Sequence, residues 1–300
     1  MNATRLLEFF DTRRERGESL VLATVIGTEG STYSKAGAQM LVDANGIFRG
    51  MLSGGCLEGD LAVRAQQVLE SGNSQVVTYD LAQEDDALWG MGVGCDGLMR
   101  VVLQAIVPTR EYAPFDQVAA VWRGGEAREV TIPVGAADID EVTIRVEPPP
   151  RILVLGAGLD AEPVVRFAVE MGWHCTVCDH RPAYIEGGDF RGAVARHCFP
   201  AAELSRSLDL DRFDAVIVMS HHLISDRTYL EQLAGTTVQY IGLLGPQHRR
   251  DRLLGELGDA APGLESRLHG PAGLDIGGRG PAPIALSIIA EVQKELAGAN

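Results

Sequence analysis

The sequence predicts an α/β protein in which an N-terminal α+β domain is followed by a Rossmann-like, doubly wound parallel sheet. The first reason is length, because 300 residues are about twice the usual size of one domain. The second is a run of three prolines, Pro148, Pro149 and Pro150, which favours an extended spacer over a helix or central strand. The third is that apolar runs alternate with helical segments after the spacer, as in parallel sheets buried on both faces. We therefore expect domains over residues 1–147 and 151–300.

The N-terminal domain is expected to open with a helix over residues 4–16, because apolar side chains form a stripe there and Gly17 ends the pattern. The elements expected next are a strand over 19–28, a hairpin over 38–52, a helix over 57–69 with Leu61, Ala65 and Val68 on one face, and strands over 74–81 and 97–106. From residue 110 to 150 the pattern weakens to a glycine turn at Gly124-Gly125 and a hairpin before the prolines.

The second domain is expected to begin with a buried strand over residues 151–156. The expected elements after it are a helix over 161–171, strands over 173–179, 193–199 and 214–220, a helix with Ser225 as its N-cap, a strand over 237–244 and a helix over 248–257. The last helix opens with Pro281 and Pro283, and the side chains expected to be buried on it are Ile284, Ile288, Ile289, Val292 and Leu296. Such alternation is typical of a doubly wound sheet.

Charge and composition narrow the classes of partner. The 41 acidic and 26 basic residues give a net charge of −15, which disfavours nucleic acids and anionic membrane surfaces. No apolar run reaches the ~18 residues of a membrane helix, and Glu8 and Asp11 interrupt the place of a signal-peptide core, so we expect a cytoplasmic protein. The five cysteines do not form a disulfide framework, and Cys175 and Cys178 should point to opposite faces of one strand.

A dinucleotide-type loop follows the first strand of the second domain. Gly156, Gly158 and Ala161 match the pattern G-x-G-x-x-A, in which glycines allow a tight turn and a close approach of the pyrophosphate. Asp179 ends the next strand, where an acid binds a ribose hydroxyl, although Arg181 would equally favour a phosphate. The alternative is a vestigial loop in which the acid next to the helix, Asp160, serves the helix dipole.

His221 and His222 follow a later strand, at the carboxyl end where α/β sheets bind ligands. The pattern is equally compatible with a ligand site that includes His221 and with a solvated loop.

Three glycine-rich loops stand out in the N-terminal domain: residues 30–37 with Lys35, residues 53–59 with Gly54, Gly55 and Cys56, and residues 90–97 with Cys95. Consecutive glycines expose backbone N–H groups to anions, and a thiol at a helix N-terminus tends toward thiolate. The alternatives are buried structural cysteines and an exposed strand connection. We interpret the three loops as a pocket for an anionic ligand with several functional groups.

Long motifs in both domains resemble the XdhC/CoxI accessory proteins. In the first domain they are GSTYSKAGAQMLV (30–42), GGCLEG (54–59) and WGMGVGCDGLMRVV (89–102). In the second they are VLGAGLDAEPVVRFAVEMGW (154–173), VCDHRPAY (177–184), YIGLLGPQHRR (240–250) and HGPAGLDIGGRGPAPIALSIIAEV (269–292).

The resemblance implies a two-domain, dimeric maturation factor of xanthine dehydrogenase-type molybdenum hydroxylases. Such a protein binds molybdenum cofactor while a cysteine desulfurase installs its terminal sulfur, and inserts it into the apo-hydroxylase. Carried over to this sequence, Cys95 would be the thiol at the molybdenum, and Glu58 the family carboxylate in its glycine-rich turn. Gly156, Gly158 and Asp179 would hold a nucleotide-like part of the ligand. A non-enzymatic role is therefore expected.

Two other functions are compatible with the residues. One is an NAD(P)-dependent Rossmann oxidoreductase, which draws on the loop at Gly156, on Asp179 and on the two histidines, but lacks a proton donor tied to a substrate pocket. The other is an interaction module whose Rossmann loop binds nothing, for which a side chain such as Asp160 in the phosphate position would be evidence.

Overall fold

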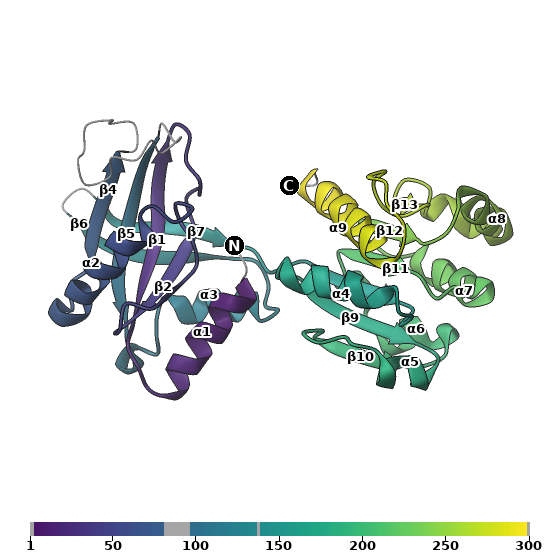
Figure 1. Ribbon diagram of the computed structural model, residues 1–300, viewed down its shortest axis with the longest axis horizontal. Coiled ribbons are helices and arrows are strands. Elements are labelled where there is room, and N and C mark those ends of the chain that lie inside the picture. The colour runs from purple at the N-terminus through teal and green to yellow at the C-terminus, as the bar shows by residue number, and fades with distance from the viewer. Residues whose placement is uncertain (1–2, 81–96, 137–138, 299–300) are drawn as a thin grey trace. The chain divides into compact units, whose positions relative to one another are not determined.

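The computed structural model describes residues 3–80, 97–136 and 139–298, and it separates into two compact units, Met1–Pro149 and Pro150–Asn300 (Figure 1). The first unit is built on an antiparallel sheet and the second on a parallel one, so the predicted α/β class with a Rossmann-like second half is confirmed.

The first unit holds a five-stranded sheet in the order β3-β2-β1-β5-β4 and a two-stranded β6-β7 sheet. Its elements are α1 Ala3–Glu15, β1 Leu20–Glu29, β2 Gln39–Asp43, β3 Phe48–Arg49, α2 Glu58–Ser71, β4 Gln75–Asp80, β5 Leu98–Ile106, α3 Phe115–Trp122, β6 Arg128–Ala136 and β7 Ile139–Val146. The elements predicted before residue 107 are all present, with bounds shifted by a few residues.

The central strand β1 buries both of its faces. Leu20 and Leu22 belong to a core that α1, α3 and the β6–β7 hairpin close, whereas Val21 and Ala23 face a second core under α2. Because successive side chains of a strand alternate between faces, one continuous apolar run serves both cores. Leu61, Ala65 and Val68 are buried on α2, as their spacing predicts.

The prediction for residues 110–125 missed a helix. The predicted glycine turn at Gly124-Gly125 ends α3, where the N–H of Gly125 donates to the carbonyls of Ala120 and Val121 at 3.1 Å. A Cβ on Gly125 would lie 2.8 Å from the Ala120 carbonyl oxygen, so the close approach requires glycine. The hairpin predicted before the prolines is also present and consists of β6 and β7.

The second unit has six parallel strands in the order β10-β9-β8-β11-β12-β13. Its elements are β8 Arg151–Leu155, α4 Ala161–Glu170, β9 His174–Asp179, α5 Pro182–Gly187, β10 Ala195–Cys198, α6 Leu204–Ser207, β11 Ala215–Val218, α7 Leu223–Leu233, β12 Tyr240–Leu243, α8 Gln247–Leu257, β13 Leu268–His269 and α9 Pro281–Gly298. Numbered from β8, this is the strand order 3-2-1-4-5-6 of a Rossmann sheet, whose ligand crevice lies between its first and fourth strands.

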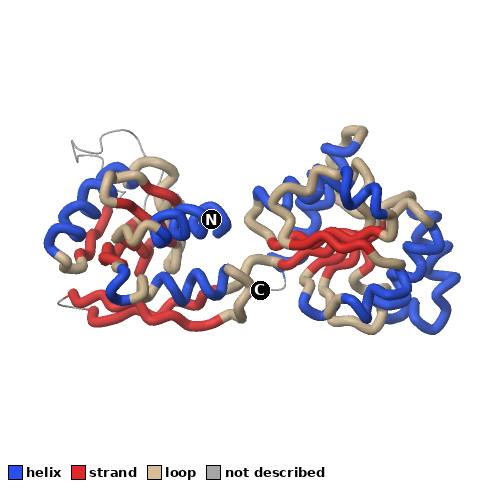
Figure 2. The backbone as a smooth tube through the Cα atoms, turned by 90° about the horizontal axis from the view of Figure 1, so that it is seen from below, coloured by secondary structure: helices blue, strands red, loops and turns tan. Residues whose placement is uncertain are grey.

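Helices cover both faces of this sheet, which Figure 2 shows as a layer of strands between layers of helices. One core includes residues of α4 and α9, and the other includes residues of α7 and α8. Cys175 belongs to the first core and Cys178 to the second, so the two thiols face opposite sides as predicted. Burial raises the pKa of each thiol to about 12, which leaves both as inert core residues.

The last helix differs from the prediction at two residues, Ile284 and Leu296, of which Leu296 is partly buried against the core. Ala285, Ile288, Ile289 and Val292 are buried on α9, but Ile284 is 37% exposed. It precedes Ala285 by one position, about 100° around the helix, and so lies at the flank of the buried stripe. Within the described parts of the chain, no helix combines the length and apolar character that crossing a membrane requires.

The N-cap of α7 is His222 and not Ser225. The His222 Nδ1 accepts the backbone N–H of Ser225 at 3.3 Å and lies 2.9 Å from its hydroxyl, so that Ser225 occupies the first turn. The sequence rule favours serine because its oxygen is the commoner cap, but an imidazole nitrogen accepts the same N–H group.

We expect His222→Ala to destabilise the first turn of α7 by about 1 kcal/mol, because one backbone donor loses its acceptor. His222→Asn should restore most of this stability, since asparagine is a good N-cap. Hydrogen exchange of the first α7 amides measures the effect. Unchanged exchange in His222→Ala would contradict the assignment of the cap.

Candidate functional site

The glycine-rich loop before α2 is held by a buried carboxylate. Glu58 is 2% exposed, and its Oε1 accepts the backbone N–H groups of Leu52 and Ser53 at 2.7 and 2.8 Å. Its Oε2 accepts the Ser53 hydroxyl at 2.6 Å and the Gly55 N–H at 3.0 Å. The carboxylate thus lies beneath the loop and binds the loop itself.

These hydrogen bonds also decide the charge of Glu58. Burial alone would raise its pKa, but the bonds from the hydroxyl and backbone of Ser53 and from Leu52 outweigh burial and lower the pKa below its ordinary value. Glu58 is therefore an anion that fixes the path of the loop, with both oxygens already engaged.

The outer side of this loop is open. Gly54 and Gly55 have φ values of 78° and 114°, a left-handed backbone that glycine adopts readily, and both are exposed. Cys56 follows them with an exposed thiol, two residues before α2. The loop therefore presents glycine backbone and a thiol on its outer surface.

The loop at residues 30–37 lies against the glycine-rich loop at residues 53–59. The ring of Tyr33 packs on Gly54, where a Cβ would lie 3.4 Å from the ring, and the Ser34 hydroxyl donates to the Met51 carbonyl at 3.4 Å. Lys35 is exposed on the same loop. The structure thus brings Lys35 and the glycine–cysteine loop to one edge of the first unit.

Gly97, the described end of the third glycine-rich segment, lies at the same edge. A Cβ on Gly97 would lie 2.5 Å from the Ser31 carbonyl oxygen and 2.7 Å from that of Glu29. Cys95, two residues earlier, lies outside the described residues. The described ends of the three glycine-rich segments therefore meet.

In the second unit, the loop after β8 lies at the predicted crevice. Gly156 has a φ of 123°, and a Cβ there would lie 2.4 Å from the carbonyl oxygen of Met219, at the end of β11. A Cβ on Gly158 would lie 2.8 Å from Asp160 Oδ1. Gly156 is thus packed against the end of β11, the neighbouring strand in the sheet, and the space beside Gly158 holds the Asp160 carboxylate.

Asp179 is buried at the end of β9 and has no exposed side-chain surface. Its oxygens accept the Ala157 N–H at 2.7 Å, the Arg181 N–H at 2.9 Å and a bidentate pair from the Arg181 guanidinium at 2.9 and 2.7 Å. Burial would raise the pKa of Asp179, but these bonds outweigh it and lower the pKa. The guanidinium in turn lies 3.9 Å from the ring centre of Tyr184.

His221 closes the other side of the crevice. Its Nε2 lies 2.6 Å from Asp160 Oδ2, and its backbone φ of 58° is uncommon for a residue other than glycine. Its neighbour His222 caps α7. The two histidines therefore have different roles, one at the glycine-rich loop and one at a helix end.

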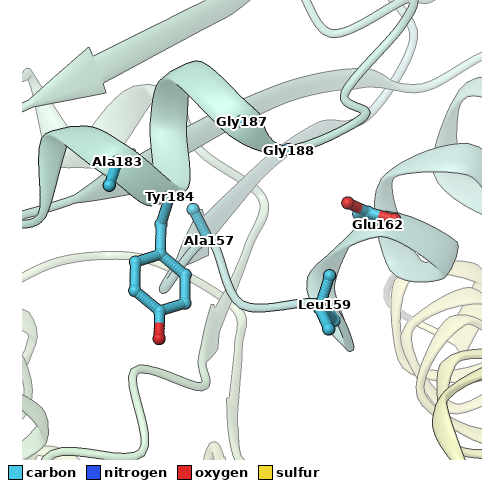
Figure 3. A pocket seen from close by; sticks show the side chains of 7 residues that line it. All are labelled: Ala157, Leu159, Glu162, Ala183, Tyr184, Gly187 and Gly188. Atoms are coloured by element: carbon cyan, nitrogen blue, oxygen red, sulfur yellow. The ribbon is translucent and has the colours of Figure 1, made fainter.

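A cavity of about 210 Å³ lies between the glycine-rich loop and α5 (Figure 3). Its lining residues are Ala157, Leu159, Glu162, Ala183, Tyr184, Gly187 and Gly188. Leu159 and Glu162 line it from the α4 side and Tyr184 from the α5 side, so the wall is mostly apolar with one aromatic ring.

The predicted site residues fall into two groups. Lys35, Gly54, Gly55, Cys56 and Glu58 gather at one edge of the first unit, and the members of the second group, in the other unit, are Gly156, Gly158, Asp179 and His221. In the described residues, no three His, Cys, Asp or Glu side chains are placed to hold a metal ion.

Sequence reasoning missed a buried cluster at the end of β11. Asp226 has no exposed side-chain surface, and its carboxylate accepts the Ser220 hydroxyl and an Arg249 N–H, each at 2.5 Å. It also missed Ser53, whose hydroxyl joins Glu58 to the backbone N–H of Leu57. Neither arrangement has a short motif, because the partners lie at spacings that no common capping pattern covers.

Comparison with known proteins covers both units. Residues 13–80 match the XdhC and CoxI family, and residues 152–292 match the XdhC Rossmann domain. A Bacillus subtilis protein, named as a probable subunit of xanthine dehydrogenase, is 34% identical over 94% of each chain. An Escherichia coli protein named "Molybdenum cofactor insertion chaperone PaoD" is 24% identical over 92% of this chain and 83% of its own.

A solved structure matches the whole chain. It is a crystal structure from Bacillus halodurans described as a xanthine dehydrogenase, with a TM-score of 0.83, 30% identity and coverage of 100% of this chain and 97% of the other. The two units therefore occur together, in this order, in a solved structure as well as in the curated relatives.

Proposed function

Because the chain belongs to the XdhC and CoxI family, we propose that it is a maturation factor for a molybdenum hydroxylase of the xanthine dehydrogenase type. Its cargo is molybdenum cofactor, which it binds and inserts into the apo-enzyme. Two relatives support this role by their names, since one is a molybdenum cofactor insertion chaperone and the other a probable subunit of xanthine dehydrogenase.

One observation carries the proposal: the described ends of three glycine-rich segments meet at one edge of the first unit. The loop fixed by Glu58 is open on its outer side, with exposed glycine backbone next to the exposed Cys56 thiol. A soft thiolate suits a molybdenum–sulfur centre, and backbone without side chains lets a bulky pterin approach.

The three glycine-rich segments contain one positive charge, Lys35, in a unit that is acidic overall. Residues 1–150 carry 22 acidic and only 12 basic side chains, so the overall field repels an anion. Lys35 supplies an exposed positive charge on a loop that packs against the Cys56 loop. The cargo is therefore held by local groups, and the acidic surface serves recognition of protein partners.

The complete cycle adds further partners to this proposal. A cysteine desulfurase supplies the terminal sulfur of the molybdenum centre while the cofactor is bound, and the apo-hydroxylase receives the product. The maturation factor works as a homodimer in the cytoplasm and performs no catalytic step of its own.

We expect the purified protein to retain roughly one molybdenum per chain after exposure to molybdenum cofactor and gel filtration, because a thiolate holds the metal. Cys95→Ala should lower the retained molybdenum by at least about tenfold, the scale of effects at metal sites. Molybdenum is measured by mass spectrometry of the metal and pterin by fluorescence of its oxidation product. Transfer is measured as the activity gained by an apo-hydroxylase.

Two matched variants complete this experiment. Cys56→Ala removes the thiol of the loop that Glu58 fixes, and it should also reduce retention. Cys198→Ala removes an exposed thiol from β10 of the second unit and should change nothing. Equal molybdenum in the wild type and in Cys95→Ala would rule out that thiol as a ligand.

A further inference from the structure

The loop after β8 has the backbone of a dinucleotide-binding loop. Gly156 is pressed against the end of β11, since a Cβ would lie within 2.6 Å of three backbone atoms of Met219 and Ser220. Any side chain at position 156 would clash with this backbone, so the tight turn is retained as in the Rossmann fingerprint. In contrast to a loop that leaves room for a pyrophosphate, the space beside this loop is filled by a side chain of the same unit.

That space holds the carboxylate of Asp160. In the fingerprint, the second glycine leaves room for the pyrophosphate, and here Asp160 Oδ1 lies 2.8 Å from where a Cβ of Gly158 would be. Asp160 directly precedes α4, at the helix end whose dipole attracts anions, yet it makes no capping hydrogen bond to the helix. A phosphate would have to displace this carboxylate or lie beside a like charge.

His221 holds the carboxylate in place. It comes from the end of β11, 61 residues later in the chain, and its Nε2 lies 2.6 Å from Asp160 Oδ2. The side chain of Asp160 is only 19% exposed. Moving Asp160 away would break this contact and leave the position to water or ligand.

Asp179, the carboxylate that would bind the ribose of a dinucleotide, is also occupied by partners from its own unit. The acid at the end of the second strand accepts ribose hydroxyls in Rossmann enzymes. Here both oxygens of Asp179 are engaged by the Ala157 N–H and by Arg181, and no part of its side chain is exposed. A ribose could reach this carboxylate only after Arg181 had left it.

We infer that Asp160, held by His221, acts as an internal anion in the phosphate-binding position, so that this Rossmann unit rejects dinucleotides. The contact of Asp160 with His221 and that of Asp179 with Arg181 also disfavour an NAD(P)-dependent oxidoreductase. The first occupies the pyrophosphate position, and the second occupies the carboxylate that would bind the ribose. The unit retains the sheet and the loop of a nucleotide-binding domain, but its own side chains occupy the phosphate position and the ribose-binding carboxylate.

The test is a titration of the full-length chain with NADH and NADPH, followed by nicotinamide fluorescence and confirmed by calorimetry with NAD. The wild type should show no saturation up to about 1 mM ligand. Asp160→Ala empties the position, and it should bind at least about tenfold more tightly than the wild type because a contact charge repulsion is removed. His221→Asn, which tolerates a positive φ, should shift binding in the same direction.

A matched control separates the position from the overall charge. Asp251→Ala removes one acidic side chain from α8 of the same unit, where Asp251 is 52% exposed and pairs with Arg250, and it should bind no better than the wild type. Asp160→Asn keeps the shape and removes the charge, which guards against a misfolded alanine variant. Wild-type saturation below about 1 mM would overturn the inference, as would Asp160→Ala and Asp160→Asn variants that bind no better than the wild type.

Discussion

Replacing Glu58 by Gln should destabilise the first unit by about 2–3 kcal/mol, the scale of hydrogen bonds to a buried charge. The amide oxygen can still accept from Leu52 and Ser53, but the amide NH₂ then faces the N–H of Gly55, which donates to Oε2 at 3.0 Å in the wild type. Two donors cannot satisfy each other, so the loop must open. Retention of molybdenum should fall together with stability.

Urea unfolding measures the stability, and hydrogen exchange assigns the transition to the first unit, since a two-unit chain need not unfold in one step. Glu70→Gln is the matched control, because Glu70 is exposed on the same helix α2. The control should lie within about 0.5 kcal/mol of the wild type. If both variants behave alike, Glu58 does not hold the loop.

The contribution of Glu58 to stability should decrease as the pH falls. The pKa of Glu58 is lowered from its ordinary value of 4.5, so its contribution is fully present above that value and is lost as the pH falls through the folded-state pKa. The stability difference between the wild type and Glu58→Gln should therefore be largest near neutral pH and shrink below about pH 4.5. A difference that stays constant between neutral and acidic pH would exclude the ionised carboxylate as its source.

The second half of the fold could be predicted because its signals are local. The run from Arg151 to Leu155 is apolar after its first residue and becomes a strand buried on both faces, with the glycine turn directly after it. The strand at Leu268–His269 was missed, because two residues are too few to show any periodicity. Helix α3 was missed for a similar reason, since its eight residues end at a glycine pair that equally suits a turn.

The sequence predicts which residues belong to the candidate sites and near which loops they lie, but it does not predict the partners of their side chains. Glu58 directly follows a glycine-rich loop that is clear in the sequence, but the donors that its oxygens meet depend on the backbone path of that loop. The contact of Asp160 with His221 depends on β8 and β11 being neighbours and on a left-handed backbone at His221. Strand order follows from the Rossmann pattern, whereas the direction of these side chains does not.

The polar groups of the two candidate sites differ in whether they are paired. At the carboxyl edge of the parallel sheet, acids are paired with bases of the same unit: Asp160 with His221, Asp179 with Arg181, and Asp226 with Arg249. In the first unit, the Cys56 thiol and the Lys35 side chain are exposed beside glycine-rich loops. This contrast is the reason to expect the cargo at the first unit and a scaffold role for the second.

A second aspartate–arginine pair in the same unit serves as a control for the contribution of Asp179 and Arg181 to stability. Asp189 and Arg191 have the same spacing and the same bidentate geometry, with both N–O distances at 2.8 Å, but the aspartate side chain is 52% exposed. Asp179 is fully covered, and it also accepts the N–H of Ala157 in the glycine-rich loop. Burial and this extra bond are the main differences between the pairs.

Asp179→Ala should therefore destabilise the second unit by about 2–4 kcal/mol, whereas Asp189→Ala should leave its unfolding midpoint unchanged. The cost arises because the buried Ala157 N–H loses its acceptor, and it is limited because Arg181 is 32% exposed and can be rehydrated. Hydrogen exchange of the loop after β8 provides a local measurement, and it should accelerate only in Asp179→Ala. Equal effects of the two substitutions would mean that burial does not decide the strength of this pair, and that the loop is held by its packing against β11 alone.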